Sequence, residues 1–194
     1  HDTVRRQRQM CIRDSAEIAY LAGAEVYLIS GPVNLKSFEG VNLFNINTAD
    51  EMLLEVKNLI NEIDIFIGCA AVADFKPIDF NTSKIKKNEN DEISLKLTKN
   101  PDILKYASDH MEDKIVIGFS AETDNVIENA KIKLLKKNLN MIICNDVSDK
   151  TIGFDSNDNE VHLITHDDVI KLSKTTKLKI AKQIIKSIES LISN

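Results

Sequence analysis

Residues 64–71 read DIFIGCAA, and this stretch decides the fold because it joins an apolar strand to a turn of small residues. Hardly a polar residue interrupts the run, as is typical of a strand that is covered on both faces. Further strands are predicted at residues 24–30, 41–46, 92–97, 114–119, 141–144 and 160–165. Segments with helical periodicity separate most of these strands, so the sequence predicts an α/β domain with a mostly parallel sheet.

The predicted helices begin at recognisable caps. Thr48 and Glu51 have the spacing of a capping box at the start of one helix. Asn100 and Pro101 fit the N-cap and first position of a short second helix. The end of a further helix is predicted at residues 16–22, and two more helices are predicted at residues 125–137 and 174–192. Residues 72–91 have no clear pattern and are predicted to form a long loop.

Composition narrows the class of protein. The chain has 194 residues and a net charge of -5, which argues against a general nucleic-acid binder. No apolar run is long enough to cross a bilayer, so we expect no membrane partner. The three cysteines are widely spaced, which favours reduced thiols and a cytoplasmic location.

The first fifteen residues differ from the rest of the chain. Residues 4–15 are basic and aperiodic, whereas the chain that follows is acidic. We therefore interpret residues 1–15 as a non-native or disordered tail and residues 16–194 as one domain.

Unusual residues follow the strands, where α/β sheets bind their ligands. Residues 68–75 read GCAAVADF, and such small residues allow either close ligand approach or tight packing. Asp74 is suited to a ribose hydroxyl or a metal. Lys84 lies in a KIKK run within the long loop, where it could reach a phosphate, although composition alone favours a charged surface loop.

Two further segments have the same ambiguity. The helix start at residues 100–103 (NPDI) could bind an anion or a base edge, but a plain helix cap is the stronger local interpretation. Residues 118–123 (GFSAET) precede Lys133 and Lys137, which lie at i and i+4. Two lysines so placed could bind phosphates, or simply suit the carboxyl end of the helix dipole.

The joint order of these motifs is more specific than any one of them. The series GCAAVADF, KIKK, KNPDI, GFSAET, Lys133 with Lys137, and ICNDVS resembles the bacterial phosphopantothenate–cysteine ligase family, also called phosphopantothenoylcysteine synthetase. Gly153–Phe154 also matches, and the resemblance runs from about residue 16 to the end. It implies a Rossmann-like, doubly wound sheet with helices on both faces and a small antiparallel extension. It also implies a homodimer, commonly fused to a flavin-dependent decarboxylase.

The resemblance further implies a two-step ligation in coenzyme A biosynthesis. The carboxylate of 4'-phosphopantothenate attacks the α-phosphate of CTP, which gives an acyl-cytidylate and pyrophosphate. The amine of L-cysteine then attacks this mixed anhydride and releases CMP. Mg²⁺ is expected with the nucleotide, but its protein ligands are unassigned and Asp74 is only a candidate.

Matching the family's motifs onto this chain assigns the roles of single residues. Phe119 should pack against the nucleotide, Lys133 and Lys137 should hold its phosphates, and Lys84 should close over the site as the catalytic residue of the mobile loop. The remaining residues expected along the CTP are Gly68, Cys69, Ala70, Asp74, Asn100, Pro101, Asp102 and Ile103.

One departure from the family concerns the start of the domain. Members begin with a strand and a glycine-rich segment that contacts phosphopantothenate, and nothing in residues 1–15 matches it. We therefore expect the domain to lack its first strand and this loop, which would leave an unpaired strand edge. The chain as written should then bind CTP weakly or not at all and turn over no substrate.

Two other classes of protein are alternatives to the ligase interpretation. A non-catalytic nucleotide-binding module on the same fold would explain the absent loop, but it would not need Lys84, Lys133 and Lys137. An NAD-dependent reductase would carry a GxGxxG motif after a strand, and the chain has none.

Overall fold

The computed structural model describes residues 2–33, 38–78, 94–122, 124–146 and 158–192, with side chains from residue 12 onward except at residues 146, 158 and 159. The predicted Lys84 and Gly153–Phe154 lie outside these residues. The helices are α1 (Asp2–Leu21), α2 (Ala49–Leu59), α3 (Ile103–His110), α4 (Val126–Lys137) and α5 (Lys177–Ile192). The strands are β1 (Tyr27–Ser30), β2 (Asn42–Asn45), β3 (Ile65–Gly68), β4 (Phe75–Pro77), β5 (Leu97–Lys99), β6 (Ile115–Glu122), β7 (Met141–Asp146), β8 (Asp158–Ile164) and β9 (Val169–Thr176).

The main sheet has five strands in the order β3-β6-β7-β8-β9. Strands β3, β6 and β7 are parallel, and β8 and β9 continue the sheet in antiparallel pairing. The expected mostly parallel sheet with a small antiparallel extension is therefore confirmed.

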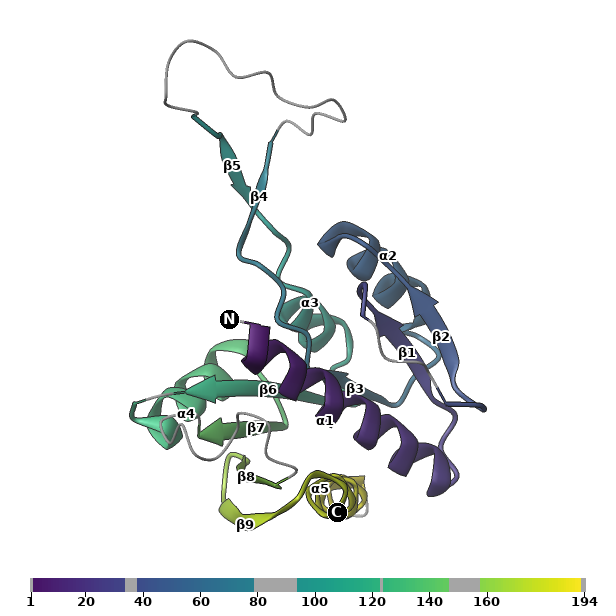
Figure 1. The fold of residues 1–194 in the computed structure, drawn as a ribbon, viewed down its shortest axis with the longest axis vertical. Coiled ribbons are helices and arrows are strands. Elements are labelled where there is room, and N and C mark those ends of the chain that lie inside the picture. The colour runs from purple at the N-terminus through teal and green to yellow at the C-terminus, as the bar shows by residue number, and fades with distance from the viewer. Residues whose placement is uncertain (1, 34–37, 79–93, 123, 147–157, 193–194) are drawn as a thin grey trace.

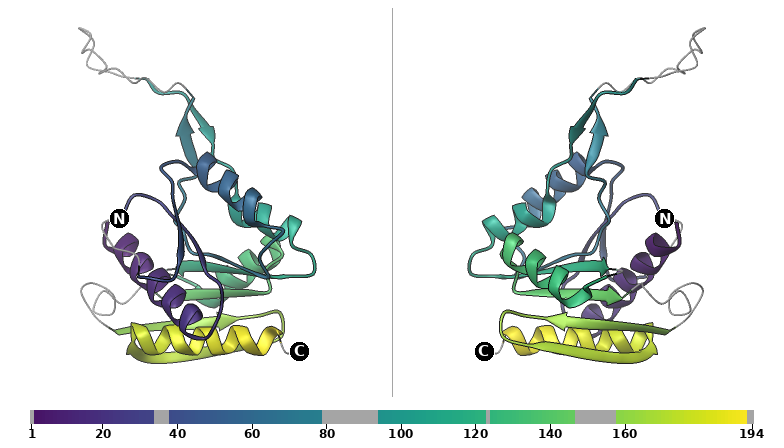
Figure 2. Two further views of the ribbon diagram at one scale, coloured as in Figure 1. Left: turned by 90° about the vertical axis from the view of Figure 1, so that its right-hand side faces the viewer. Right: turned by 90° about the vertical axis from the view of Figure 1, so that its left-hand side faces the viewer.

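Helices cover both faces of this sheet, as expected for a doubly wound fold (Figure 2). On one face α1 and α5 pack against apolar side chains of β6, β7, β8 and β9, around the fully buried Ile117 and Ile143. On the other face α2, α3 and α4 surround Val116 and Ile142. These two apolar layers form the core that positions the strand ends.

Strands β1 and β2 form a separate two-stranded parallel sheet (Figure 1). Sequence analysis predicted strands at residues 24–30 and 41–46, and the structure confirms both with shorter bounds. Within the described residues β1 pairs only with β2, and β3 pairs only with β6. In this part of the chain, β1 and β3 therefore each have one edge that pairs with no other described strand.

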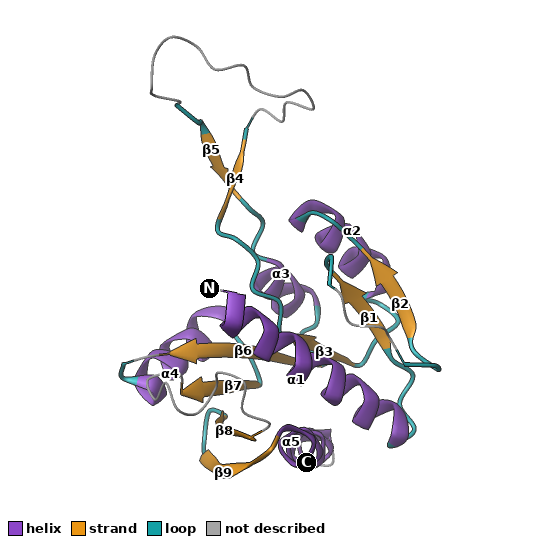
Figure 3. Cartoon of the chain, viewed as in Figure 1, coloured by secondary structure: helices purple, strands orange, loops and turns teal. Residues whose placement is uncertain are grey.

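Strands β4 and β5 form an antiparallel ribbon that projects from the body of the molecule (Figures 1 and 3). Sequence analysis placed a loop at residues 72–91 and a strand at residues 92–97, and both predictions were partly wrong. Phe75 pairs with Lys99, so part of the predicted loop forms strand β4. The second strand lies at Leu97–Lys99 instead of at the predicted residues 92–97. An ion pair between Lys76 and Asp50 ties the ribbon to α2.

The helix boundaries test the predicted caps. Thr48 is the N-cap of α2, and its Oγ1 accepts a hydrogen bond from the Glu51 amide at 3.1 Å. The Glu51 carboxylate accepts from the amide of Asn47 at 2.7 Å, so the predicted reciprocal cap is present, with its second hydrogen bond one residue before the N-cap. The prediction for α3 was wrong, because its N-cap is Asp102 and not Asn100.

The two ends of the chain also differ from the sequence-based boundaries. Strand β9 was missed, and residues 174–176 of the predicted last helix belong to it. Helix α1 continues back to Asp2 and so includes most of residues 1–15. The interpretation of these residues as a non-native or disordered tail stays a prediction. Among the described helices, none combines the length and apolar character that crossing a membrane requires.

Candidate functional site

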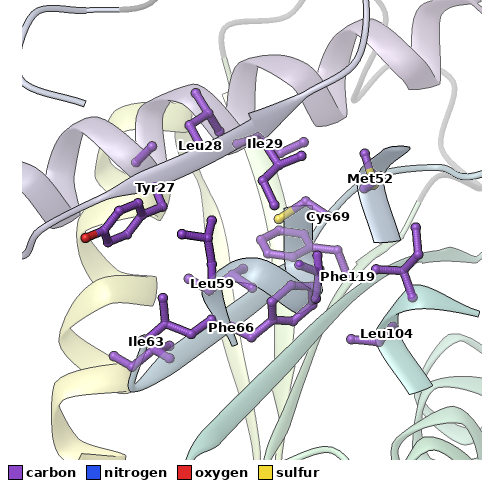
Figure 4. Close-up of a pocket in the computed structure, with 18 of the residues that line it drawn as sticks. Tyr27, Leu28, Ile29, Met52, Leu59, Ile63, Phe66, Cys69, Leu104 and Phe119 are labelled. Atoms are coloured by element: carbon purple, nitrogen blue, oxygen red, sulfur yellow. The ribbon is translucent and has the colours of Figure 1, made fainter. Parts of the chain in front are cut away.

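A cleft of about 1230 Å³ opens where β3 ends and lies between the two sheets (Figure 4). Strands β1 and β3 flank it, α1 and α5 line one side, and α2 lines the other. The start of α3 and the last turn of α4 complete the cleft. Segments far apart in the sequence thus meet at the carboxyl end of the sheet, where α/β folds bind ligands.

Gly68 ends β3, and its lack of a side chain serves packing. A Cβ at Gly68 would lie 2.9 Å from Cδ1 of Leu104, and a Cβ at Gly118 would lie 3.0 Å from Cδ2 of the same leucine. Gly68 and Gly118 are register partners on β3 and β6. Both glycines therefore let α3 approach the sheet closely, which favours the tight-packing interpretation of the GCAA segment.

Asn100 fastens two sides of the cleft together. Its backbone amide donates to the carbonyl of Asp74 at 2.8 Å, and its Nδ2 donates to the carbonyl of Ala73 at 2.8 Å. The loop after β3 is thereby tied to the residue that directly follows β5. The Oδ1 atom of Asn100 is buried and has no hydrogen-bond partner among the described residues. A buried amide oxygen of this kind is an acceptor suited to a ligand donor.

Asp102 links the start of α3 to the end of α4. Its Oδ1 accepts from the Lys105 amide at 3.1 Å and from Nζ of Lys137 at 3.0 Å. One carboxylate thus caps a helix and holds a lysine at the cleft. The lysine keeps further N–H donors, because an ammonium group has three. The same corner offers the N-terminal amides of α3, which have no acceptor within the helix.

The structure brings most of the predicted site residues together. Those that line the cleft are Gly68, Cys69, Ala70, Asp74, Asn100, Pro101, Asp102, Ile103, Phe119 and Lys137. Lys133 does not line it, because its ammonium group pairs with Glu122 at the end of β6. Lys84 lies outside the described residues.

Sequence analysis missed two lysines of the cleft. Lys99 ends β5, directly before the Asn100 contact, and Lys136 lies beside Lys137 in the last turn of α4. The adjacent lysines at residues 136–137 were the available signal, but the prediction used only the i and i+4 spacing of Lys133 and Lys137. Lys99 has no local signal, because only the β4–β5 pairing places it there.

The far end of the cleft has acidic and aromatic groups. The Tyr27 hydroxyl donates to the Glu25 carboxylate at 2.8 Å, and this hydrogen bond is the main reason that the pKa of Tyr27 is raised.

Asp74 contributes an exposed carboxylate near the Asn100 corner. In the part of the chain that the structure describes, no group of three His, Cys, Asp or Glu residues could hold a metal.

A family model described as the DNA/pantothenate metabolism flavoprotein C-terminal domain matches residues 13–192. The chain belongs to this family. The family match confirms the resemblance that the order of the motifs indicated, and the DNA/pantothenate metabolism flavoprotein family accounts for nearly the whole chain.

Curated relatives and a solved structure agree with this membership. The coenzyme A biosynthesis bifunctional protein CoaBC of Borreliella burgdorferi is 43% identical over 173 residues, which cover 88% of this chain and 43% of that protein. CoaBC of Vibrio parahaemolyticus is 41% identical over 180 residues, with coverages of 91% and 45%. The crystal structure of a CoaBC C-terminal domain superposes with a TM-score of 0.77 at 34% identity, covering 93% of this chain and 81% of that one. The chain thus spans less than half the length of these curated relatives.

Proposed function

We propose that this chain is the CTP-dependent phosphopantothenate–cysteine ligase part of a coenzyme A biosynthesis enzyme. The observation that carries the proposal is the Asn100 corner. There the loop after β3, the start of α3 and Lys137 of α4 meet through hydrogen bonds of 2.8–3.0 Å. These segments are the ones that match the family's nucleotide-binding motifs. The names of the CoaBC relatives support coenzyme A biosynthesis as the pathway.

The ligation requires a carboxylate to become an acylating agent. The phosphopantothenate carboxylate attacks the α-phosphorus of CTP, and the bond to pyrophosphate breaks. The cysteine amine then attacks the acyl carbon, loses a proton and displaces CMP. The protein must align these groups and offset phosphate charge, because both steps join or create anions.

The described residues can supply these effects. Lys137, with Lys136 and Lys99 nearby, places positive charge in the cleft for the phosphates. The N-terminal amides of α3 and the Oδ1 atom of Asn100 offer a donor and an acceptor to a base edge. Mg²⁺ would arrive with the triphosphate, since this ion is usually held by phosphates and one or two carboxylates. The exposed Asp74 is the candidate carboxylate.

The β4–β5 ribbon supports the proposed homodimer. Its apolar side chains Phe75 and Leu97 are exposed by 54% and 53%, and Ile78 and Leu95 beside it are also exposed. An isolated two-stranded ribbon is marginally stable in water, so these side chains need a partner surface. A fused flavin-dependent decarboxylase is a further proposed partner, supported by the bifunctional relatives. Sedimentation of the chain as a monomer at all concentrations would count against the dimer.

Lys137→Gln should weaken CTP binding about tenfold, because a charged hydrogen bond to phosphate is lost. NMR titration with CTP and Mg²⁺ measures this effect, and the amides of residues 100–103 should shift. Lys131→Gln is the matched control, since Lys131 is an exposed lysine of α4 outside the cleft. Equal weakening by both variants, or equal affinity for ATP and CTP, would contradict the proposed nucleotide site.

A further inference from the structure

The lysines at the end of α4 differ in how much positive charge they can offer to a ligand. Lys133 pairs with Glu122, and Lys137 pairs with Asp102 at 3.0 Å. Lys136 lines the cleft and forms no ion pair with another described residue. A carboxylate beside an ammonium group offsets its charge. The uncompensated charge that α4 brings to the cleft therefore comes mainly from Lys136.

Lys99 is a second cleft lysine whose charge is not offset. It ends β5, which leads from the projecting ribbon down to the start of α3 (Figure 1). The residue is exposed, and in the described part of the chain it too forms no ion pair. On the paired strand β4, by contrast, Lys76 is held by Asp50. The ammonium group of Lys99 is thus available to an anion in the cleft.

The contact between α3 and α4 brings these two lysines to the same end of the cleft. Lys136 directly precedes Lys137, whose Nζ lies 3.0 Å from Oδ1 of Asp102. Asp102 comes three residues after Lys99, so their Cα atoms can be at most about 11 Å apart. Ammonium groups on flexible stems can therefore approach one polyanion from two directions, one from α4 and the other from β5.

This distribution of charge suits the outer phosphates of a nucleoside triphosphate. We propose that Lys99 and Lys136 are specificity-determining residues, which bind the β- and γ-phosphates and so favour CTP over CMP. The inference rests on the proposed ligase function. Each phosphoryl group beyond the first adds negative charge, and the two uncompensated lysines offset that charge. Lys137, whose own charge is offset by Asp102, contributes mainly as a hydrogen-bond donor.

The same two lysines act on the first chemical step. When the phosphopantothenate carboxylate attacks the α-phosphorus, the bond to the bridging oxygen breaks and its electron pair stays on pyrophosphate. Negative charge therefore grows on the β- and γ-phosphates in the transition state, where positive charge held by the protein is most effective. The released pyrophosphate should accordingly compete with CTP for Lys99 and Lys136.

NMR titrations of the whole chain with CMP, CDP and CTP, in the presence of Mg²⁺, test the inference. Lys99→Gln and Lys136→Gln remove the charge and keep a polar side chain. We expect each variant to bind CTP about fivefold more weakly and CMP with unchanged affinity. The double variant should lose most of the gain in affinity from CMP to CTP. Inorganic tripolyphosphate, which has no base, should lose affinity in parallel.

Lys96→Gln and Lys131→Gln are matched controls, because both lysines are exposed and lie outside the cleft. Neither should change the ratio of the CTP and CMP affinities. A gain from CMP to CTP that survives in the double variant would overturn the inference, as would equal losses in the controls or the lack of any gain in the unaltered chain. Equal affinity for CTP and ATP, with the loss in the double variant intact, would support the two lysines as triphosphate ligands and contradict the ligase function.

Discussion

Strands β7 and β1 both carry apolar residues, yet of the two only β7 has fully buried side chains. Ile143 of β7 has no exposed surface, whereas every residue of β1 is only half-buried. The residue types are similar, so the neighbours make the difference. Strand β7 lies between β6 and β8 with helices on both faces, and among the described strands β1 pairs with β2 alone. In this fold the position of a strand in its sheet, more than its composition, decides how much it contributes to stability.

The largest expected effect contrasts these two strands directly. Ile143→Ala should lower the free energy of unfolding by about 3 kcal/mol, because it opens a cavity in an enclosed core. Leu28→Ala in β1 should cost roughly 1 kcal/mol, since a half-exposed side chain buries less apolar area. Urea unfolding followed by circular dichroism measures both values. Equal losses would mean that β1 is as well enclosed as β7.

A smaller effect is expected where α3 meets the main sheet. Gly118→Ala should destabilise the chain by roughly 1–2 kcal/mol, because its Cβ would crowd Leu104 and Leu139. Gly31→Ala, next to β1, is the matched control, since a Cβ there meets nothing within 4 Å. Thermal unfolding of the two variants should separate tight from open packing. An unchanged midpoint for Gly118→Ala would show that the two leucines shift at no cost.

The smallest effect is expected where the start of α3 meets the end of α4. Asp102→Ala should cost about 1 kcal/mol, because it removes the N-cap of α3. Asp102→Asn keeps a capping side chain and loses only the charge opposite Lys137, so it should cost a few tenths of a kcal/mol at most. Comparable losses in chemical denaturation would show that the ion pair matters more than the cap.

Local pattern predicted those elements that local interactions specify. The capping box at Thr48 and Glu51 was predicted correctly because both hydrogen bonds lie within five residues of each other. Asn100 was assigned as a cap by the same logic, and this was wrong because its amide bonds to the loop at residues 73–74. Such a contact across 26 residues has no trace in the surrounding sequence. Asp102, two residues later, was free to cap instead.

The same limit applies to the candidate site. The order of the motifs identified ten residues that share one cleft, because family motifs record tertiary proximity. The i and i+4 spacing of Lys133 and Lys137 predicts that both lie on one face of α4. This spacing carries information about the helix itself and none about its neighbours. It could not show that Glu122, at the end of β6, lies beside Lys133 and that Asp102 lies beside Lys137. Tertiary partners separate the two lysines.

Leu104 lies beside two glycine positions at once, so a change at either glycine should be felt at position 104. Its Cδ1 atom occupies the space beside Gly68, and its Cδ2 atom occupies the space beside Gly118. A homologue that gains a methyl group at either glycine would have to move or shorten the leucine at position 104, and at position 118 also the leucine at position 139. The three positions should therefore covary, and a lineage could change them only in a restricted order.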